Sequence, residues 1–172
     1  MKVLGVVAGP RRGGNTARLV EGVLAGAAES GHETHIYYMS DMDVSPLMHD
    51  GEEYVYPEDD FASLMPHIES MGALVLGSPV YYDHVSTRCK LFIDRLYYYG
   101  KSHGDEYRAL FPGGVKFVPV LSCGWDNPDV YGEVQEWMNK RMTHYWDMKV
   151  AGSLKAYGTG SHPVQTDTVL LA

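Results

Sequence analysis

A continuous apolar run at residues 3–8 leads through a glycine-rich turn directly into a helical pattern. The run has the length of a buried strand, and after the turn apolar residues recur at Val20, Val23 and Leu24, as on one face of a helix. The turn at residues 9–16 therefore joins a buried strand to a helix. A helix N-terminus leaves backbone N–H groups unpaired and carries partial positive charge. This connection predicts a binding site for an anion.

The side chains of the turn favour the same interpretation. Arg11 and Arg12 supply fixed positive charge, and a guanidinium can bind a phosphate through two hydrogen bonds. Asn15 and Thr16 add an amide and a hydroxyl at the first helical turn. The alternative is a plain polar turn in which Asn15 or Thr16 caps the helix, but capping does not account for the arginines. The turn lacks both the Gly-Lys-Ser/Thr of a P-loop and the G-x-G-x-x-G of a dinucleotide site.

Strand patterns alternate with helix patterns along the rest of the chain. The further strands are expected at residues 32–39, 73–77, 115–121 and 148–157, and the helices at residues 15–30, 61–68, 89–100 and 134–142, with another beginning at 168–172. This alternation predicts βαβ units around a parallel sheet. We expect a three-layer α/β fold: a single domain over residues 1–172, with five parallel strands in the flavodoxin-like order 2-1-3-4-5 and helices on both faces.

Three loops are expected to meet at one edge of this sheet. Ligands of such sheets bind beyond the carboxyl ends of the strands, where the strand order reverses. The loops that begin at Gly9, Ser78 and Ser122 leave those ends. The second of them offers aromatic and apolar surface at Val80 and Tyr81, which suits a planar ligand.

Composition and charge restrict the partners. The 172 residues carry a net charge of −8, which argues against nucleic acid as a partner. No apolar run is long enough to span a bilayer and the N-terminus lacks the layout of a signal peptide, so we expect a cytoplasmic protein without a membrane partner. The connection at residues 41–60 holds eight acidic residues and is longer than usual, which indicates a functional loop or a partner surface.

Two segments closely resemble one family. The segment G-P-R-R-G-G-N-T-A-R-L resembles the S-P-R-x-x-G-N-T opening of flavodoxin-like FMN reductases, which include the NAD(P)H-dependent FMN reductases and the iron–sulfur flavoproteins. The segment S-P-V-Y-Y-D-H-V-S-T-R-C-K-L-F-I-D-R-L resembles the family's S-P-V-Y-x-x-x-V-S-x-x-x-K-x-F-I-D-R motif. The likeness covers residues 3–97 and continues more weakly to residue 153. Gly9 stands where the family usually has Ser, which removes one hydroxyl contact to phosphate.

The resemblance implies an FMN site. Arg11, Asn15 and Thr16 would hold the phosphate, and residues 79–83 and 122–124 would frame the flavin ring. The full set of cofactor-binding residues implied is Gly9, Pro10, Arg11, Gly14, Asn15, Thr16, Ser78, Pro79, Val80, Tyr81, Tyr82, Asp83, Ser122, Cys123 and Gly124.

The expected function is FMN-dependent NAD(P)H oxidoreduction. Hydride would pass from a nicotinamide cofactor through FMN to a small acceptor such as free flavin or a quinone, with no catalytic side chain assigned because the chemistry belongs to the cofactor. The alternatives are a one-electron carrier of the flavodoxin type and a flavin-free binding or regulatory module. The iron–sulfur branch carries a cysteine cluster before the second helix. This chain has two distant cysteines where a cubane needs about four thiolates, so no iron–sulfur cluster and no metal is expected.

A homodimer or higher homo-oligomer is also expected. The motivation is excess aromatic surface, since six side chains are too many for one small core. They are Tyr54, Tyr56, Tyr97, Tyr98, Tyr99 and Trp125. The family resemblance likewise implies dimers whose flavin sites are completed by the neighbouring subunit.

Three further patterns are weak. Cys89 and Arg95 have the C-x5-R spacing of a phosphatase loop, but they lie within a helical pattern. His32 and His35 could suggest a metal site, yet residues three apart on a strand face opposite sides. Cys123 lies near the expected flavin and is interpreted as a small buried filler rather than a redox group.

Overall fold

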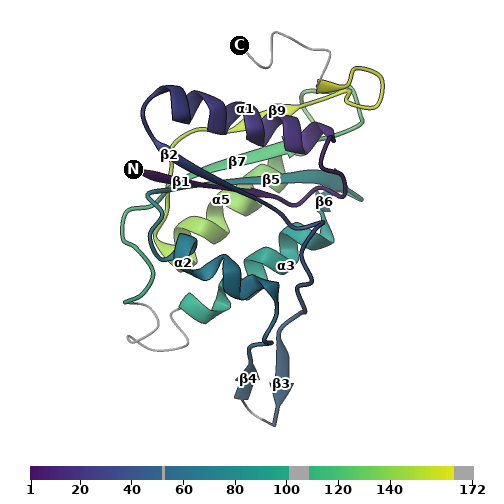
Figure 1. Cartoon of the computed structure of the whole chain (residues 1–172). Coiled ribbons are helices and arrows are strands. Elements are labelled where there is room, and N and C mark those ends of the chain that lie inside the picture. The colour runs from purple at the N-terminus through teal and green to yellow at the C-terminus, as the bar shows by residue number, and fades with distance from the viewer. Residues whose placement is uncertain (52, 101–108, 165–172) are drawn as a thin grey trace.

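The computed structural model describes residues 1–51, 53–100 and 109–164, and its centre is a twisted sheet (Figure 1). The strand order is β2-β1-β5-β7-β8, with β9 also paired to β7 and β6 paired to β5. The strands are β1 Lys2–Val7, β2 Glu33–Tyr38, β5 Ala73–Tyr81, β6 His84–Val85, β7 Lys116–Ser122, β8 Lys149–Val150 and β9 Leu154–Ala156. All pairs are parallel except β5–β6, and β1 runs in register with β5 from Val3 beside Ala73 to Val7 beside Gly77.

The predicted order 2-1-3-4-5 is confirmed, with seven strands in the sheet rather than five. One additional strand is β6, which folds back on the extended end of β5. The other arises because the fifth predicted strand, residues 148–157, is divided into β8 and β9. Residues 151–153 separate them, and both parts pair with β7.

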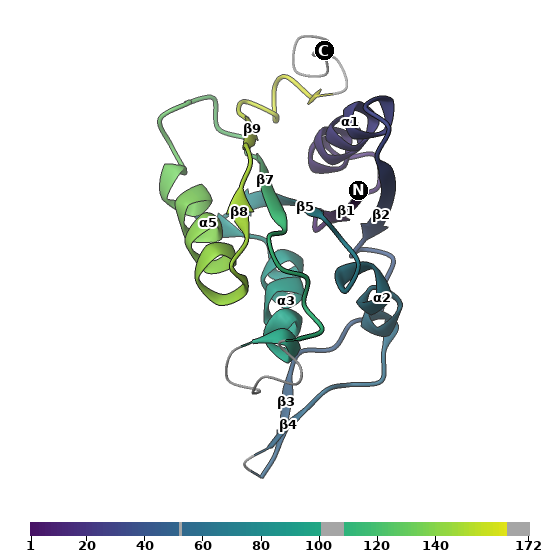
Figure 2. The ribbon, with the colours of Figure 1, turned by 90° about the vertical axis from the view of Figure 1, so that its left-hand side faces the viewer.

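Helices cover both faces of the sheet. Helix α1 (Asn15–Glu29) lies on one face, and α2 (Met65–Ile68), α3 (Thr87–Arg95) and α5 (Gly132–Trp146) lie on the other (Figures 1 and 2). Two 3-10 helices, η1 (Asp60–Ser63) and η2 (Leu96–Tyr99), adjoin α2 and α3. No helix in the described ranges is long and apolar enough to cross a bilayer. The predicted start of a helix at 168–172 lies outside the described residues.

Alternating side chains of the buried strands fill two hydrophobic clusters. On β1, Leu4 and Val6 join the cluster under α3 and α5, while Val3 and Val7 join the cluster under α1. Glycines let α1 approach the sheet closely: a Cβ on Gly77 would lie 2.4 Å from Val20 Cγ2. This close packing places the N-terminus of α1 over the carboxyl ends of β1 and β5.

The long acidic connection is partly ordered rather than a plain loop. Strands β3 (Met48–Asp50) and β4 (Glu53–Val55) form a hairpin that projects away from the domain (Figure 1). The base of the connection is fixed by Arg95, whose side chain is 3% exposed and forms an ion pair with Asp59. Arg95 also donates to the carbonyl of Ser45 at 3.0 Å and lies 4.7 Å from the ring centroid of Phe61.

The second predicted helix is shorter than its pattern suggested. Asp59 caps it, accepting from the Phe61 backbone N–H at 3.0 Å. The helix then breaks into η1 and α2, with Pro66 in the first turn of α2. A proline lacks the N–H of a helix interior but is tolerated in a first turn, so the break before it follows from the sequence.

Candidate functional site

A cavity of about 210 Å³ lies at the carboxyl ends of β1, β5 and β7, beside the start of α1. The three loops predicted to converge do line this one cavity. Its walls are formed by Gly9, Pro10, Arg11, Gly14, Asn15, Thr16, Pro79, Val80, Tyr81, Ser122, Gly124, Thr159 and Gly160. Eleven of the fifteen predicted residues are among them, and the remaining four are Ser78, Tyr82, Asp83 and Cys123.

Within the described residues, no side chain caps the N-terminus of α1. Gly14 occupies the N-cap position in an extended conformation, so the alternative in which Asn15 or Thr16 caps the helix is wrong. Asn15 instead donates from Nδ2 to the Thr159 carbonyl at 3.2 Å and accepts from the Val164 backbone N–H at 3.0 Å. The first backbone N–H groups of α1 therefore remain available to an anion.

The two arginines of the turn have different surroundings. Arg11 lines the cavity and has no carboxylate partner among the described residues. Arg12 instead forms an ion pair with Asp41 and lies 4.4 Å from the ring centroid of Tyr38. Arg11 is therefore the arginine of the turn that supplies charge to the cavity.

Tyr38 is part of the surroundings of Arg12. Burial, and then a 2.6 Å hydrogen bond donated to the Glu21 carboxylate, raise the pKa of the Tyr38 hydroxyl to about 12. The phenol therefore stays protonated at neutral pH and keeps donating to Glu21. This contact fixes the ring against which Arg12 rests, on the side away from the cavity.

Thr16 and Ser122 join the first loop to the third. Their hydroxyl oxygens lie 2.7 Å apart and both residues are buried. This hydrogen bond connects the first turn of α1 to the end of β7. Thr16 was predicted as a phosphate contact, and the structure shows that its hydroxyl also has a partner within the protein.

Ser78 holds the second loop through hydrogen bonds of its side chain. Its buried hydroxyl accepts from the Ser86 backbone N–H at 2.9 Å and donates to the Pro79 carbonyl at 2.8 Å. Ser86 in turn donates to the Ala8 carbonyl at 2.8 Å and caps α3. Ser78 therefore positions the Pro79–Tyr81 wall without lining the cavity itself. The network also ties the second loop to the end of β1.

Tyr82 and Asp83 form the turn between β5 and β6 rather than a cavity wall. Both have left-handed backbones, with φ of 47° and 61°, and Tyr82 is fully exposed. The Asp83 carboxylate accepts a hydrogen bond from Tyr131 at the start of α5. Burial, and then the Asp83 charge and this hydrogen bond, raise the pKa of Tyr131.

Cys123 is buried behind the cavity. Its Sγ lies 3.4 Å from the Ala156 carbonyl, and burial raises the pKa of the thiol. A protonated, enclosed thiol is a poor nucleophile. The interpretation of Cys123 as a filler agrees with this environment.

Sequence reasoning missed a fourth loop, formed by residues 158–160. Thr159 and Gly160 line the cavity, and the Thr159 hydroxyl donates to the Cys123 carbonyl at 2.9 Å. Gly158 has a left-handed backbone with φ of 60°. The Gly-Thr-Gly that directly follows a predicted strand was the available signal, because glycines at a strand end permit a tight turn.

The observed geometry fits the phosphate end of FMN. The uncapped N-terminus of α1 and Arg11 provide donors and charge. Gly9 lines the cavity, and a Cβ there would lie 3.3 Å from Thr16 Cβ, so the turn packs closely against the start of α1. The cavity volume is below the roughly 300–1,000 Å³ of whole cofactor sites. The flavin ring would therefore extend beyond the cavity, past the lining residue Tyr81, which is 49% exposed.

The structure excludes the phosphatase interpretation. Cys89 is completely buried within α3, and burial raises its pKa to about 12. The guanidinium of Arg95 forms a buried ion pair with Asp59.

The histidines near β2 do not form a metal site. His35 lies 2.8 Å from the Glu33 carboxylate, and its ring is 4.3 Å from that of His67. No group of three or more His, Cys, Asp or Glu side chains within the described ranges could hold a metal ion.

Comparisons with known proteins identify the family of this chain. The family model described as NADPH-dependent FMN reductase matches residues 1–116. An iron–sulfur flavoprotein of Archaeoglobus fulgidus is 28% identical over 92% of this chain and 69% of its own length. YwqN of Bacillus subtilis, whose name proposes an NAD(P)H-dependent FMN-containing oxidoreductase, is 28% identical over 95% of this chain and 87% of its own length. The iron–sulfur flavoprotein MJ1083 of Methanocaldococcus jannaschii is 35% identical over a shorter match. This match covers 55% of this chain and 51% of the relative.

Solved structures support the fold. An NAD(P)H:quinone oxidoreductase from Methanothermobacter marburgensis superposes with a TM-score of 0.68 at 19% identity, over 99% of this chain and 92% of the other. The Trp repressor binding protein from Bacillus subtilis gives 0.67 at 20% identity, over 98% and 92%. The family match over residues 1–116, which include the turn at residues 9–16 and the Pro79–Tyr81 wall, shows that the chain belongs to the NADPH-dependent FMN reductase family.

Proposed function

We propose that this protein is an FMN-dependent oxidoreductase that takes hydride from NADH or NADPH. The observation that carries the proposal is the uncapped N-terminus of α1 beside Arg11, at the carboxyl ends of β1 and β5. The family assignment and the names of relatives such as YwqN support it. Bound FMN supplies hydride transfer between a nicotinamide and an acceptor.

The chain's own residues would bind and orient the cofactor. The N–H groups of α1 and the Arg11 guanidinium would hold the phosphate, and Gly9 allows close approach of the backbone. The Pro79–Tyr81 wall would bear one side of the ring. Neither Cys89 nor Cys123 is placed to act chemically, so the protein contributes positioning and charge rather than a catalytic side chain.

A small acceptor is proposed as the oxidant. Tyr81 of the cavity wall is half exposed, so a flavin resting there would be open to a second planar molecule. Free flavin or a quinone has this shape. The NAD(P)H:quinone oxidoreductase with the same fold supports the second choice.

The first test is binding. The visible spectrum of the purified protein is recorded, and FMN and riboflavin are titrated into protein stripped of flavin. We expect tighter binding of FMN, because riboflavin leaves the donors of the phosphate site without an anion. If the Kd for both ligands exceeds about 100 µM, the binding free energy is weaker than about 5.5 kcal/mol. The protein would then be a flavin-free module.

The second test is turnover. Stopped-flow mixing of the FMN-loaded protein with NADH and with NADPH should bleach the flavin within seconds, and the faster donor is the preferred one. Failure of both donors over minutes, with dithionite reducing the flavin in two separate one-electron steps, would instead identify a one-electron carrier.

We also propose a homodimer, on different grounds from those that the sequence suggested. The tyrosines largely pack on one another: Tyr54 and Tyr97 lie 4.6 Å apart, and Tyr56 and Tyr98 lie 5.0 Å apart. Tyr99 is buried. Less aromatic surface is therefore left for a dimer interface than the sequence suggested. The remaining argument for a dimer is that a neighbouring subunit would complete the exposed side of the flavin site. Light scattering that gives a 19.1 kDa particle at tens of micromolar would refute the dimer.

A further inference from the structure

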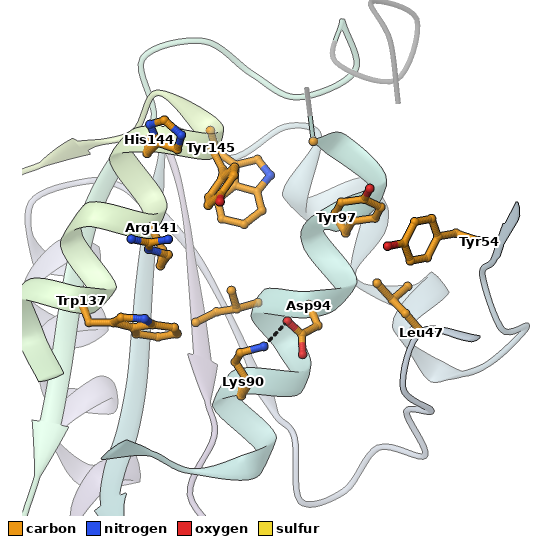
Figure 3. A pocket seen from close by; sticks show the side chains of 12 residues that line it. Leu47, Tyr54, Lys90, Asp94, Tyr97, Trp137, Arg141, His144 and Tyr145 are labelled. Carbon is orange, nitrogen blue, oxygen red and sulfur yellow. Dashed lines mark hydrogen bonds and ion pairs between the residues drawn. The ribbon is translucent and has the colours of Figure 1, made fainter. Parts of the chain in front are cut away.

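A second cavity, of about 650 Å³, lies between α3, α5 and the segment that carries the β3–β4 hairpin (Figure 3). It shares no lining residue with the cavity beside α1. Its volume is within the roughly 300–1,000 Å³ typical of sites for small molecules. The proposed flavin function does not account for it.

Half of the twelve described lining residues carry aromatic rings. Helix α5 contributes Trp137 and Tyr145, and the opposite side is formed by Tyr97 of η2 and Tyr54 of β4 (Figure 3). The Trp137 ring also lies 4.6 Å from that of His84, which fixes its orientation. Flat faces on both sides of a space this size suit a planar aromatic ligand, because stacked and edge-on ring contacts are favourable.

The cavity also contains an unmatched positive charge. Arg141 follows Trp137 by four residues, so the two side chains lie on the same face of α5. Its Nε is buried and makes no hydrogen bond, and no carboxylate pairs with its guanidinium in the part of the chain that the structure describes. The nearest ring contact is with Tyr145, whose centroid is 5.8 Å from Arg141 Cζ.

The other cation of the wall is already paired. Lys90 Nζ lies 2.5 Å from the Asp94 carboxylate, one helical turn further along α3 (Figure 3). Among the described lining residues, the remaining Lys or Arg is Arg141. A guanidinium presents parallel donors that match a carboxylate or sulfonate, and leaving a buried donor unpaired is unfavourable.

We propose that this cavity binds an aromatic anion. The planar ring lies against Trp137 and Tyr145, and the carboxylate or sulfonate accepts from Arg141. The ligand occupies this cavity independently of FMN, because the two cavities have separate walls.

The test compares 1-naphthoate with its neutral analogue 1-naphthylmethanol by calorimetric titration, in the presence and absence of saturating FMN. We expect naphthoate to bind at least tenfold more tightly than the alcohol, and equally with and without FMN. Arg141→Met should remove the difference between the two ligands, and Arg141→Lys should retain part of it. Lys140→Met is the matched control, because Lys140 is exposed on the same helix and pairs with Glu136 at 2.8 Å.

Several outcomes would overturn the proposal. One is equal affinity for both ligands, or an unchanged naphthoate affinity in Arg141→Met with thermal unfolding like that of the wild type. Competition between naphthoate and FMN would place the anion in the flavin cavity instead. A third outcome combines two results: the wild type does not bind naphthoate, and Arg141→Met has a lower particle mass than the wild type. This would show that a second copy of the chain fills the cavity. Trp137→Leu, which removes a wall but no charge, should weaken both ligands and provides a second variant.

Discussion

Gly9 is the residue at which this chain departs from its family's usual motif, and its surroundings predict what serine would do there. We expect Gly9→Ser to tighten FMN binding by up to about tenfold, since one hydrogen bond to a charged group contributes roughly 1.5–3 kcal/mol and part of that is lost to crowding. The new Cβ would lie 3.3 Å from Thr16 Cβ, so Thr16 must shift by a few tenths of an ångström.

The control is Gly13→Ser, because a Cβ on Gly13 meets no atom within 4 Å. Fluorescence titration with FMN measures both variants. Weaker binding by Gly9→Ser alone would mean that the Thr16–Ser122 hydrogen bond matters more to the site than the additional hydroxyl.

The two neighbouring arginines provide a matched pair for the phosphate site. Arg11→Met should weaken FMN about 10- to 100-fold, the loss of one charged hydrogen bond of roughly 1.5–3 kcal/mol, while leaving riboflavin nearly unchanged. Arg12→Met should change FMN affinity less than threefold, because Arg12 pairs with Asp41 outside the cavity. Equal effects of the two substitutions would show that general charge, rather than a contact from Arg11, attracts the anion.

At the scale of elements, Arg95 joins α3 to the base of the acidic connection. Breaking a buried ion pair by removing one partner costs about 3–5 kcal/mol. We therefore expect Arg95→Met to lower the free energy of unfolding by this amount in urea denaturation. Lys90→Met on the same helix is the control and should cost below about 0.5 kcal/mol, because its pair with Asp94 is partly exposed. Similar losses in the two variants would mean that the Asp59–Arg95 pair does not anchor the connection.

The same pair predicts a loss of stability in acid. Burial alone would raise the pKa of Asp59, but the hydrogen bonds from Arg95, Ser45 and Phe61 outweigh it and hold the pKa below its ordinary value of 3.8. A carboxyl with a lowered folded-state pKa contributes stability above its unfolded pKa and loses it as pH falls through the folded value.

The difference in unfolding free energy between the wild type and Asp59→Asn should therefore be constant near neutral pH and shrink below about pH 3.8. Denaturation at a series of pH values measures it. A difference that stays constant to pH 2 would show that Asp59 does not titrate with folding.

At the scale of the whole molecule, much of the fold could be predicted because its signals are local. Residues 3–8 and 73–77 are unbroken apolar runs, and each is followed by glycine- or proline-containing turns. The glycine-rich turn at residues 9–16 could be recognised equally well. The role of Asn15 was not, because its partners Thr159 and Val164 are 144 and 149 residues away.

The β3–β4 hairpin and the division of the last strand could not be predicted from the sequence, for a related reason. Residues 48–55 mix charged and apolar side chains in segments of three, too short to show a period. Similarly, β8 and β9 are defined by pairing with β7 rather than by their own pattern. Arg95 resembled part of a phosphatase motif, and only the tertiary position of Asp59 reveals its structural role.

The hydrogen bonds of Asn15 also have a consequence for the order of events during synthesis. The turn at residues 9–16 leaves the ribosome first, yet Asn15 can be held only after Thr159 and Val164 have emerged. A nascent chain that lacks residues 158–164 has this turn without the fourth wall of the cavity. Contacts between distant parts of a chain form late in folding. We therefore expect the cofactor to bind after the domain has been translated and when its folding is almost complete.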